Sequence, residues 1–496
     1  MARQWLVRLG IAAAAIAVLA AIGVVGTAWW NSRLPDTYNV MDFGELDFGG
    51  GPRPAGAHSS HGHLGTTSVA NLHGPQDGTA DARFDLTAQE AAIRLPSGKT
   101  VDALTFDGSL PGPELRVRRG DLVEVVLRNR DVAAGVTIHW HGVDVPNAED
   151  GVAGVTQDAV APGESYTYRF RAEQVGTFWY HSHQVGSKEV RRGLFGAFVI
   201  EPADGVTEGT LDLALVAHDF DGIQTLNGRD GVQRRAVDPG TPVRLRLVNT
   251  DNTPRRFALA GVPFRIGAID GTDLDGPTPI ERRALVVAAG GRYDLTFTMP
   301  AAPVELGIGV GDPALALSPD GRGRRLAPMP EEVFDPLTYG RPAVTPFDAS
   351  SRFDRRFTLE IGRKPGFFDG RPGFQWTLNG GIYPDVPVFV VEDGDLVRMT
   401  ITNDSGGLHP MHLHGHHMLV LSRDGRPSTG SPWWVDTLDV ADGERYELAF
   451  RADNPGLWMD HCHNLRHAAK GLTMHIAYAG VHTPFLAGGE AENRPE

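Results

Sequence analysis

The hydrophobic and polar positions divide the chain into one long apolar segment at the start and a much longer region of short alternating runs. From about residue 80, runs such as VEVVLR and YTYRFR alternate between apolar and polar residues, and Gly, Pro, Asn and Asp separate them. A period of two with frequent turn residues is typical of strands in antiparallel sandwiches. We therefore expect an all-β protein made of β-sandwiches.

The apolar segment, residues 1–30, carries Arg3 and Arg8 near its start and ends on two tryptophans. Roughly 20 apolar residues can span a bilayer, and tryptophan favours the membrane interface, so the segment suits a membrane anchor. A cleaved signal peptide is the alternative, because the small residues GTA at 26–28 loosely fit a cleavage site. Both interpretations predict an extracytoplasmic protein, membrane-anchored or secreted.

An internal repeat organises the region of alternating runs. The pattern V-x-x-G-x-x-V-x-x-x-x-x-N occurs three times with the same offsets, starting at Val117, Val237 and Val391. A second pattern, G-x-x-Y-x-x-x-F, follows in each copy, starting at Gly163, Gly290 and Gly443. The repeat predicts three homologous sandwich domains, at residues 81–203, 204–345 and 346–486.

The segments that flank these domains have compositions typical of flexible chain. Residues 31–80 are rich in Gly, Pro and His and predict a flexible tether, and residues 487–496 predict a disordered tail. The tether histidines could capture a metal ion or simply belong to a solvated linker; they are His58, His61, His63 and His73.

Histidines recur at fixed places in the outer two copies. Counted from the glycine of the second pattern, His181 and His183 of copy one have the same offsets as His461 and His463 of copy three. The middle copy has Ile308 and Val310 there, so it lacks those side chains. The middle domain is therefore expected to separate or orient the outer two.

Each outer copy has a second H-x-H pair after its first pattern. Residues i and i+2 of a strand share one face, so each pair presents two imidazoles to one side. Four pairs in register predict a cluster between copies one and three that binds several metal ions, for which copper is a suitable choice. The eight residues are His139, His141, His181, His183, His412, His414, His461 and His463.

The chain has one cysteine, Cys462, between His461 and His463. A lone cysteine forms no internal disulfide, so in an exported protein it is an unreactive buried residue, a reactive thiol or a metal ligand. Its side chain faces away from the flanking histidines, towards its own domain, where His409 and His467 supply nitrogens. One thiolate and two imidazoles are the ligands of a blue-copper electron-transfer site.

The motifs H-W-H, H-S-H, H-P-M-H-L-H and H-C-H-x-x-x-H, in this order, resemble the four copper motifs of bacterial, laccase-like three-domain multicopper oxidases. The resemblance covers about residues 80–480 and implies cupredoxin-like Greek-key sandwiches, four copper ions and O2 as electron acceptor. It implies a type 1 copper held by His409, Cys462 and His467, and a type 2 copper held by His139 and His412. It implies a type 3 pair held by His141, His181, His183, His414, His461 and His463.

Two positions depart from the family pattern. Leu472 stands at the axial position of type 1, where methionine is the alternative ligand, and this predicts a raised reduction potential. Met474 could replace it if the strand bulges. Many bacterial relatives have a carboxylate where this chain has Ala468.

Acidic residues near the motifs are candidates for proton supply and for orienting the histidines. Asp150 matches an acidic position that some relatives use beside type 2 copper, and we expect it to pass protons; a solvated turn residue is the alternative. Asp436 and Asp439 could hydrogen-bond a ligand imidazole or loop backbone. His416 and His417 extend the third motif and are expected to support the site or the packing.

Composition narrows the partners. The net charge of −15 argues against nucleic acid, because binding to that polyanion depends on Lys and Arg. The nine methionines are scattered, which disfavours Cu(I) as substrate and favours a phenol or aromatic amine. An oxidase of Cu(I), Fe(II) or Mn(II) remains the alternative. A non-catalytic scaffold would have lost ligands, and a copper nitrite reductase would not need four H-x-H pairs. We expect a monomer.

Overall fold

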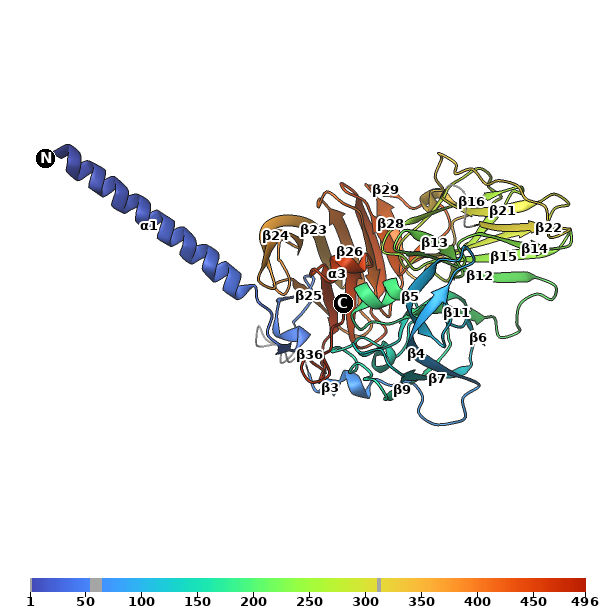
Figure 1. The fold of residues 1–496 in the computed structure, drawn as a ribbon, viewed down its shortest axis with the longest axis horizontal. Helices are drawn as coiled ribbons and strands as arrows, with labels where there is room; N and C mark the ends of the chain where they lie inside the picture. Colours follow the sequence, from blue (N-terminus) through green and yellow to red (C-terminus); the bar gives the residue numbers. More distant parts are fainter. Residues whose placement is uncertain (1, 54–64, 310–313) are drawn as a thin grey trace.

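The computed structural model describes residues 2–53, 65–309 and 314–496, so His58, His61, His63 and Val310 lie outside the described residues. A long helix, α1 (Ala2–Asn31), projects from a body made of strands (Figure 1). The described part of the body contains only short helices: α2 (Gly186–Arg192), α3 (Leu465–Ala468), η1 (Val40–Asp42), η2 (Val69–Asn71), η3 (Asn147–Glu149) and η4 (Pro336–Thr338). The predicted all-β class is confirmed.

Domain 1 is a sandwich of two four-stranded sheets, ordered β5-β4-β7-β9 and β6-β11-β10-β8. Its aromatic core includes Trp140, Phe170 and Tyr180, all fully buried. The strands are β4 (Ala82–Arg94), β5 (Thr100–Phe106), β6 (Leu115–Arg118), β7 (Leu122–Asn129), β8 (His139–His141), β9 (Ser165–Arg171), β10 (Gly176–His181) and β11 (Phe195–Glu201).

Domain 2 pairs the sheet β13-β12-β15-β20-β17-β18 with the sheet β14-β22-β21-β16-β19. Ile308, at one of the lost histidine positions, is buried in its core. The strands are β12 (Leu211–Phe220), β13 (Ile223–Leu226), β14 (Val232–Ala236), β15 (Pro242–Asn249), β16 (Arg255–Ala260), β17 (Arg265–Ile269), β18 (Thr272–Asp273), β19 (Leu285–Val287), β20 (Arg292–Thr298), β21 (Val304–Ile308) and β22 (Ala314–Ser318).

Domain 3 pairs β2-β25-β34-β33-β27-β31 with β24-β23-β26-β32-β28-β29, and β30 joins β28. The sandwich therefore borrows β2 from the N-terminal segment. The strands are β2 (Glu45–Asp47), β23 (Arg355–Phe368), β24 (Arg371–Leu378), β25 (Pro387–Val391), β26 (Leu396–Asn403), β27 (His409–Leu413), β28 (Met418–Arg423), β29 (Arg426–Pro427), β30 (Trp434–Val435), β31 (Thr437–Val440), β32 (Arg445–Arg451), β33 (Leu457–Cys462) and β34 (Thr473–Tyr478).

The first repeated pattern has the same structural role in all three domains. Its glycine has a positive φ of 89–95° at Gly120, Gly240 and Gly394, a conformation that only glycine adopts without strain. Its asparagine is buried, and the side-chain amide donates to backbone carbonyls of nearby loops, for example from Asn403 to Gly407 and Val440. In all three sandwiches, the glycine of the pattern therefore forms a turn, and the asparagine holds nearby loops by hydrogen bonds.

The segment predicted to be a flexible tether is ordered against the body wherever it is described, so that prediction is wrong there. β1 (Thr37–Tyr38) pairs with β36 (Ala487–Gly488), β2 pairs with β25, and β3 (Thr67–Ser68) pairs with β35 (Val481–His482). Val40, Met41 and Val69 are buried in the main core. A few apolar residues among the glycines and prolines suffice to dock the segment.

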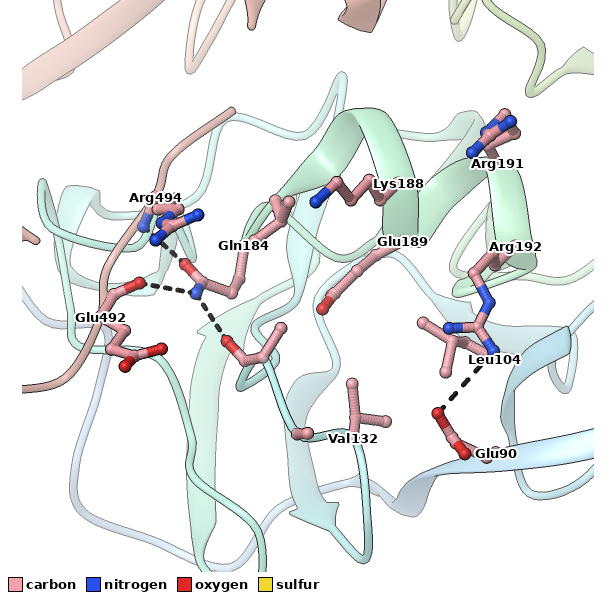
Figure 2. A pocket seen from close by; sticks show the side chains of 13 residues that line it. Glu90, Leu104, Val132, Gln184, Lys188, Glu189, Arg191, Arg192, Glu492 and Arg494 are labelled. Atoms are coloured by element: carbon pink, nitrogen blue, oxygen red, sulfur yellow. Dashed lines mark hydrogen bonds and ion pairs between the residues drawn. The ribbon is translucent and has the colours of Figure 1, made fainter.

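The last ten residues were expected to be disordered, and this prediction is also wrong. Asn493 accepts a hydrogen bond from the amide of Ala159, and the amide of Arg494 donates to the Gln184 side chain. Figure 2 shows Gln184 of domain 1 also reaching the Glu492 backbone beside a cavity of about 320 Å³. The tail is ordered despite its polar composition because it forms these hydrogen bonds with domain 1.

Candidate metal centres

The four H-x-H pairs come together between domains 1 and 3 because of strand register. On domain 1, β8 pairs with β10 so that His139 lies opposite His181. On domain 3, β27 pairs with β33 so that His412 lies opposite His461. Directly opposed residues share a face. All eight imidazoles are consequently buried in one interdomain cluster, which we call the eight-histidine cluster.

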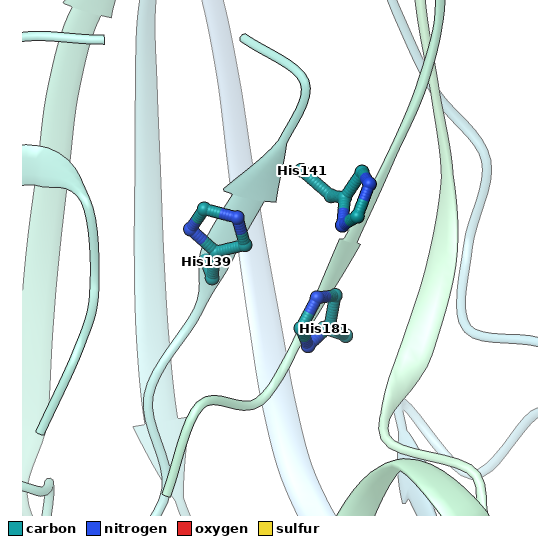
Figure 3. Close-up of side chains that lie close together, drawn as sticks. All are labelled: His139, His141 and His181. Carbon is teal, nitrogen blue, oxygen red and sulfur yellow. The ribbon is translucent and has the colours of Figure 1, made fainter. Parts of the chain in front are cut away.

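The distances in the eight-histidine cluster suit shared cations. His139 Nε2 lies 3.4 Å from His412 Nε2, and His414 Nε2 lies 3.1 Å from His461 Nε2. Potential ligand atoms lie within 4.8 Å of one another in three triads: His139, His141 and His181 (Figure 3); His139, His412 and His414; and His183, His414 and His461. Each triad can present three imidazoles to one ion.

Several ring nitrogens in this cluster make no hydrogen bond within the described residues. His181 Nε2, His183 Nε2 and both nitrogens of His463 are buried without a hydrogen bond in the described structure. Burial and neighbouring imidazoles hold the pKa of these three histidines well below the usual value, so the rings are neutral. Neutral imidazoles with unused lone pairs are the form that binds transition metals, and the residues therefore fit copper.

The predicted thiol site forms a second cluster inside domain 3. Cys462 Sγ lies 3.5 Å from His409 Nδ1 and 3.8 Å from His467 Nδ1. Burial, with the nearby His467, lowers the pKa of His409 to about 3, and burial with the Lys470 charge lowers that of His467 to about 4. One thiol and two neutral imidazoles suit one copper ion. We call this set the thiol cluster.

Comparison with known proteins agrees with this chemistry. Sequence profiles described as multicopper oxidase match residues 87–205 and 362–480. The chain belongs to the multicopper oxidase family. The oxidase is accordingly a copper-dependent oxidoreductase with O2 as acceptor.

Individual relatives are similar over most of their length. The oxidase is 27% identical to multicopper oxidase MmcO of Mycobacterium tuberculosis over 86% of this chain and 92% of the relative. It is 29% identical to laccase-1 of Botryotinia fuckeliana over 76% and 78%. The crystal structure of a multi-copper oxidase from Pseudomonas thermotolerans matches with a TM-score of 0.64 and 29% identity, over 81% of this chain and all of that one.

Asp150 lies between the two outer domains' histidines. It directly follows η3, its side chain is 1% exposed, and the alternative of a solvated turn residue is therefore wrong. Its carboxylate lies 3.1 Å from the Nδ1 atoms of both His139 and His414. Asp150 can thus orient one imidazole from each domain.

Asp436 also contacts the eight-histidine cluster. Its carboxylate lies 3.2 Å from His141 Nε2, and its backbone oxygen lies 3.0 Å from His412 Nδ1. Burial acts to raise the pKa of Asp436. The Arg292 guanidinium and the two imidazoles outweigh burial and hold the pKa well below its usual range. Asp439 makes no hydrogen bond to a histidine in the described residues, and burial raises its pKa to about 8.

Arg292 comes from the middle domain and was not singled out by the sequence. Its guanidinium donates two bonds to the Asp436 carboxylate, at 2.7 and 2.6 Å, and one bond to the Thr177 carbonyl of domain 1. The equivalent positions in domains 1 and 3 are Ser165 and Arg445, so the internal repeat does not mark Arg292 as a site residue. Domain 2 therefore lacks the histidines but supplies a buried cation that joins all three domains.

The C-terminal residue is a second contact that the sequence did not reveal. Glu496 Oε1 lies 3.0 Å from His461 Nδ1, and the Pro495 carbonyl lies 2.6 Å from His183 Nδ1. The sequence of this polar tail does not indicate that it contacts the histidines. The ordered tail therefore covers one side of the eight-histidine cluster.

Leu472, which is expected at the axial position of type 1, directly precedes β34, and Met474 lies within that strand. The Cys462 amide donates to the Leu472 carbonyl at 3.0 Å, and β33 and β34 pair without a bulge, with Met474 opposite Asp460. Leu472 and Met474 are both buried. The bulge needed to bring Met474 into the position of Leu472 is absent from this pair of strands.

The two remaining histidines of the third motif contact protein groups. His416 Nε2 lies 2.7 Å from the Tyr478 hydroxyl. His417 lies 3.2 Å from Asp144; burial opposes its protonation, but the Asp144 carboxylate prevails and raises its pKa to about 9. Both residues thus support the loop that follows β27.

Proposed function

We propose that the oxidase removes electrons singly from a phenol or aromatic amine and passes them to O2. The type 1 site would consist of His409, Cys462 and His467, and the type 2 site of His139 and His412. The type 3 pair would be held by His141, His181, His183, His414, His461 and His463. Bound copper, four ions per chain, would supply one-electron transfer and the four-electron reduction of O2 to water.

One observation carries this proposal: the thiol cluster and the eight-histidine cluster share β33. Cys462 Sγ points to His409, while its neighbour His461 points to His414. Adjacent strand residues face opposite sides. A single stretch of backbone therefore joins the site suited to electron entry to the site suited to O2.

The surroundings of His467 support an organic reductant over a metal ion. His467 is half-buried, and the charges near it are those of Lys470 and Arg363, which help to lower its pKa. Cations close to the exposed edge repel Fe(II) and Cu(I). The metal-ion oxidase therefore remains the second candidate.

The protons for O2 reduction would come through the carboxylates of the cluster. Asp150 is within hydrogen-bond reach of two imidazoles, whereas Ala468 offers no proton at its own position. A general acid must lie within such reach of its acceptor, directly or through one water. We assign Asp150 to this role.

An oxygen-electrode comparison of a phenol, Fe(II) and Cu(I) on one copper-loaded preparation tests the function. We expect O2 uptake with the phenol to exceed that with either metal ion, and absorption at about 600 nm from a thiolate-bound copper. Faster uptake with Fe(II) or Cu(I) would replace the proposal by the metal-ion oxidase, and no uptake with any donor would contradict both.

We also propose that α1 is retained as an anchor, with the body outside the cytoplasm. Within Gln4–Asn31, a window of 18 residues has a mean hydropathy of 2.5, and no part of that window is buried. The oxidase is expected to act as a monomer. Mass spectrometry of the protein from its membrane fraction would detect cleavage.

A further inference from the structure

The end of α1 is attached to one β-hairpin of domain 3. Trp29 Nε1 donates to the Gly370 carbonyl at 3.0 Å, the Gly370 amide donates to Ser32 Oγ, and the Leu34 amide donates to Asp369. Asp369 and Gly370 form the turn between β23 and β24, and Figure 1 shows α1 leaving the body beside these strands. The turn of the hairpin therefore lies at the level where the apolar span ends.

The hairpin, residues 363–376, has the composition of a membrane interface. Phe374 is 65% exposed, and Phe367 and Phe368 are half-buried. The hairpin carries Arg363, Lys364 and Arg371 against one acidic residue, although the whole chain has a net charge of −15. Aromatic rings favour the headgroup level and basic residues favour acidic lipids.

A groove lies between α1 and domain 3, and the apolar span forms one of its walls. Its volume is about 690 Å³, and most of its lining is apolar. The walls include Val24, Val25 and Ala28 of α1 and Pro365, Phe367 and Ile382 of domain 3. Because Val24 and Val25 belong to the predicted span, a bilayer around α1 places this groove in contact with lipid tails.

The far end of the same hairpin touches the thiol cluster. The ring centroid of Trp376 lies 4.8 Å from that of His409 and 4.6 Å from that of His467. Trp376 is five residues beyond Arg371, which at 3.3 Å per residue is roughly 17 Å along the strand. The thiol cluster, the proposed site of electron entry, therefore lies close to the point at which α1 leaves the membrane.

We propose that the β23–β24 hairpin is a membrane-contact surface, and that the oxidase prefers phenols that carry a hydrocarbon tail and lie in the lipid surface. The substrate half rests on the proposed oxidation of phenols, and the contact half rests on the proposed anchoring by α1. Each phenol loses one electron and its hydroxyl proton and becomes a phenoxyl radical. Four such losses supply the four electrons and four protons that convert one O2 into two waters.

Photo-crosslinking tests the contact. The full chain, confirmed by mass to retain α1, is placed in nanodiscs with p-benzoylphenylalanine at position 374. The matched control carries the same group at Leu326 of domain 2, which is 68% exposed. We expect lipid adducts from position 374 only, and adducts reduced by Lys364→Gln with Arg371→Gln in acidic lipid, since each basic residue contributes about fivefold to binding at such a surface. No adduct at position 374, or equal adducts at both positions, would overturn the membrane contact.

Kinetics in the same nanodiscs test the substrate class. Phe374→Ser is expected to raise KM several-fold for a long-chain alkylphenol and to leave the rate with unsubstituted phenol unchanged, while Leu326→Ser alters neither. An identical ratio of kcat/KM for the two phenols in wild type and Phe374→Ser would overturn the preference. Failure to oxidise unsubstituted phenol would instead refute the proposed function. The crosslinking result would not be affected, because it does not depend on activity.

Discussion

The thiol cluster and the eight-histidine cluster share β33, but their surroundings differ. Around the thiol cluster, His409 contacts the Ser405 hydroxyl and the Trp376 ring, and no carboxylate contacts its ring nitrogens in the described structure. Around the eight-histidine cluster, three carboxylates approach the imidazoles, and they belong to Asp150, Asp436 and Glu496. One side of β33 is thus poor in proton carriers and the other is rich in them.

Under the proposed function, this difference would separate the two tasks of an oxidase. Electron entry needs a soft ligand, a rigid shell and an exposed edge, which Cys462, Trp376 and half-buried His467 would provide. O2 reduction also needs protons, and carboxylates against imidazoles can supply them. Variants that alter one side of β33 alone test whether the separation holds.

Cys462→Ser is expected to have the largest effect, because it removes the only thiolate. Blue absorption and phenol oxidation should both be lost, while the bound copper falls by one ion per chain. The eight histidines keep their partners in this variant, so metal analysis serves as its internal control. Phenol oxidation at the wild-type rate would refute the electron-entry site.

Arg292→Gln is expected to have the next largest effect, on stability and on metal binding. Removing one partner of a buried ion pair typically costs about 3–5 kcal/mol, because Asp436 is left charged and buried. Thermal unfolding and copper titration measure the loss. The control is Arg445→Gln at the equivalent repeat position, which is exposed and should stay within about 0.5 kcal/mol of wild type. Equal losses in both variants would mean that the interdomain pair has no special role.

The sequence predicts what depends on local pattern. Period-two alternation gives the strands, and the repeat with its offsets places His181 and His461 on equivalent strands that the structure does bring together. Local pattern also points to Cys462 beside His409 and His467, which lie within ligand distance of one another.

The contacts that the sequence does not predict join segments far apart in the chain. Arg292 meets Asp436 across 144 positions, and Glu496 reaches His461 because the tail docks on domain 1. A single sequence shows the charge of such residues but not their partners. The N-terminal segment is a similar case, because β2 becomes ordered only by pairing with β25 of a distant domain.

Asp150→Asn is expected to slow O2 reduction and to leave electron entry intact. The amide keeps the shape and one hydrogen bond but cannot hold the proton between His139 and His414. Loss of a partner of this kind typically costs about 10–100-fold in activity. Stopped-flow bleaching of the blue band by phenol should keep its wild-type rate while O2 uptake falls. Unimpaired O2 uptake would show that protons reach the cluster by another route.

Leu472→Met is expected to have the smallest effect and to act only on the thiol side of β33. A thioether beside Cys462 stabilises the oxidised ion and lowers the reduction potential, and about 59 mV corresponds to a tenfold change in the one-electron equilibrium. Redox titration of the blue band measures the shift. The matched control is Met474→Leu, because Met474 is equally buried but lies opposite Asp460 in a ladder without a bulge. That variant should leave the potential unchanged. If Met474→Leu shifts the potential and Leu472→Met does not, the axial neighbour of the thiol is Met474, and the raised potential predicted from Leu472 is wrong.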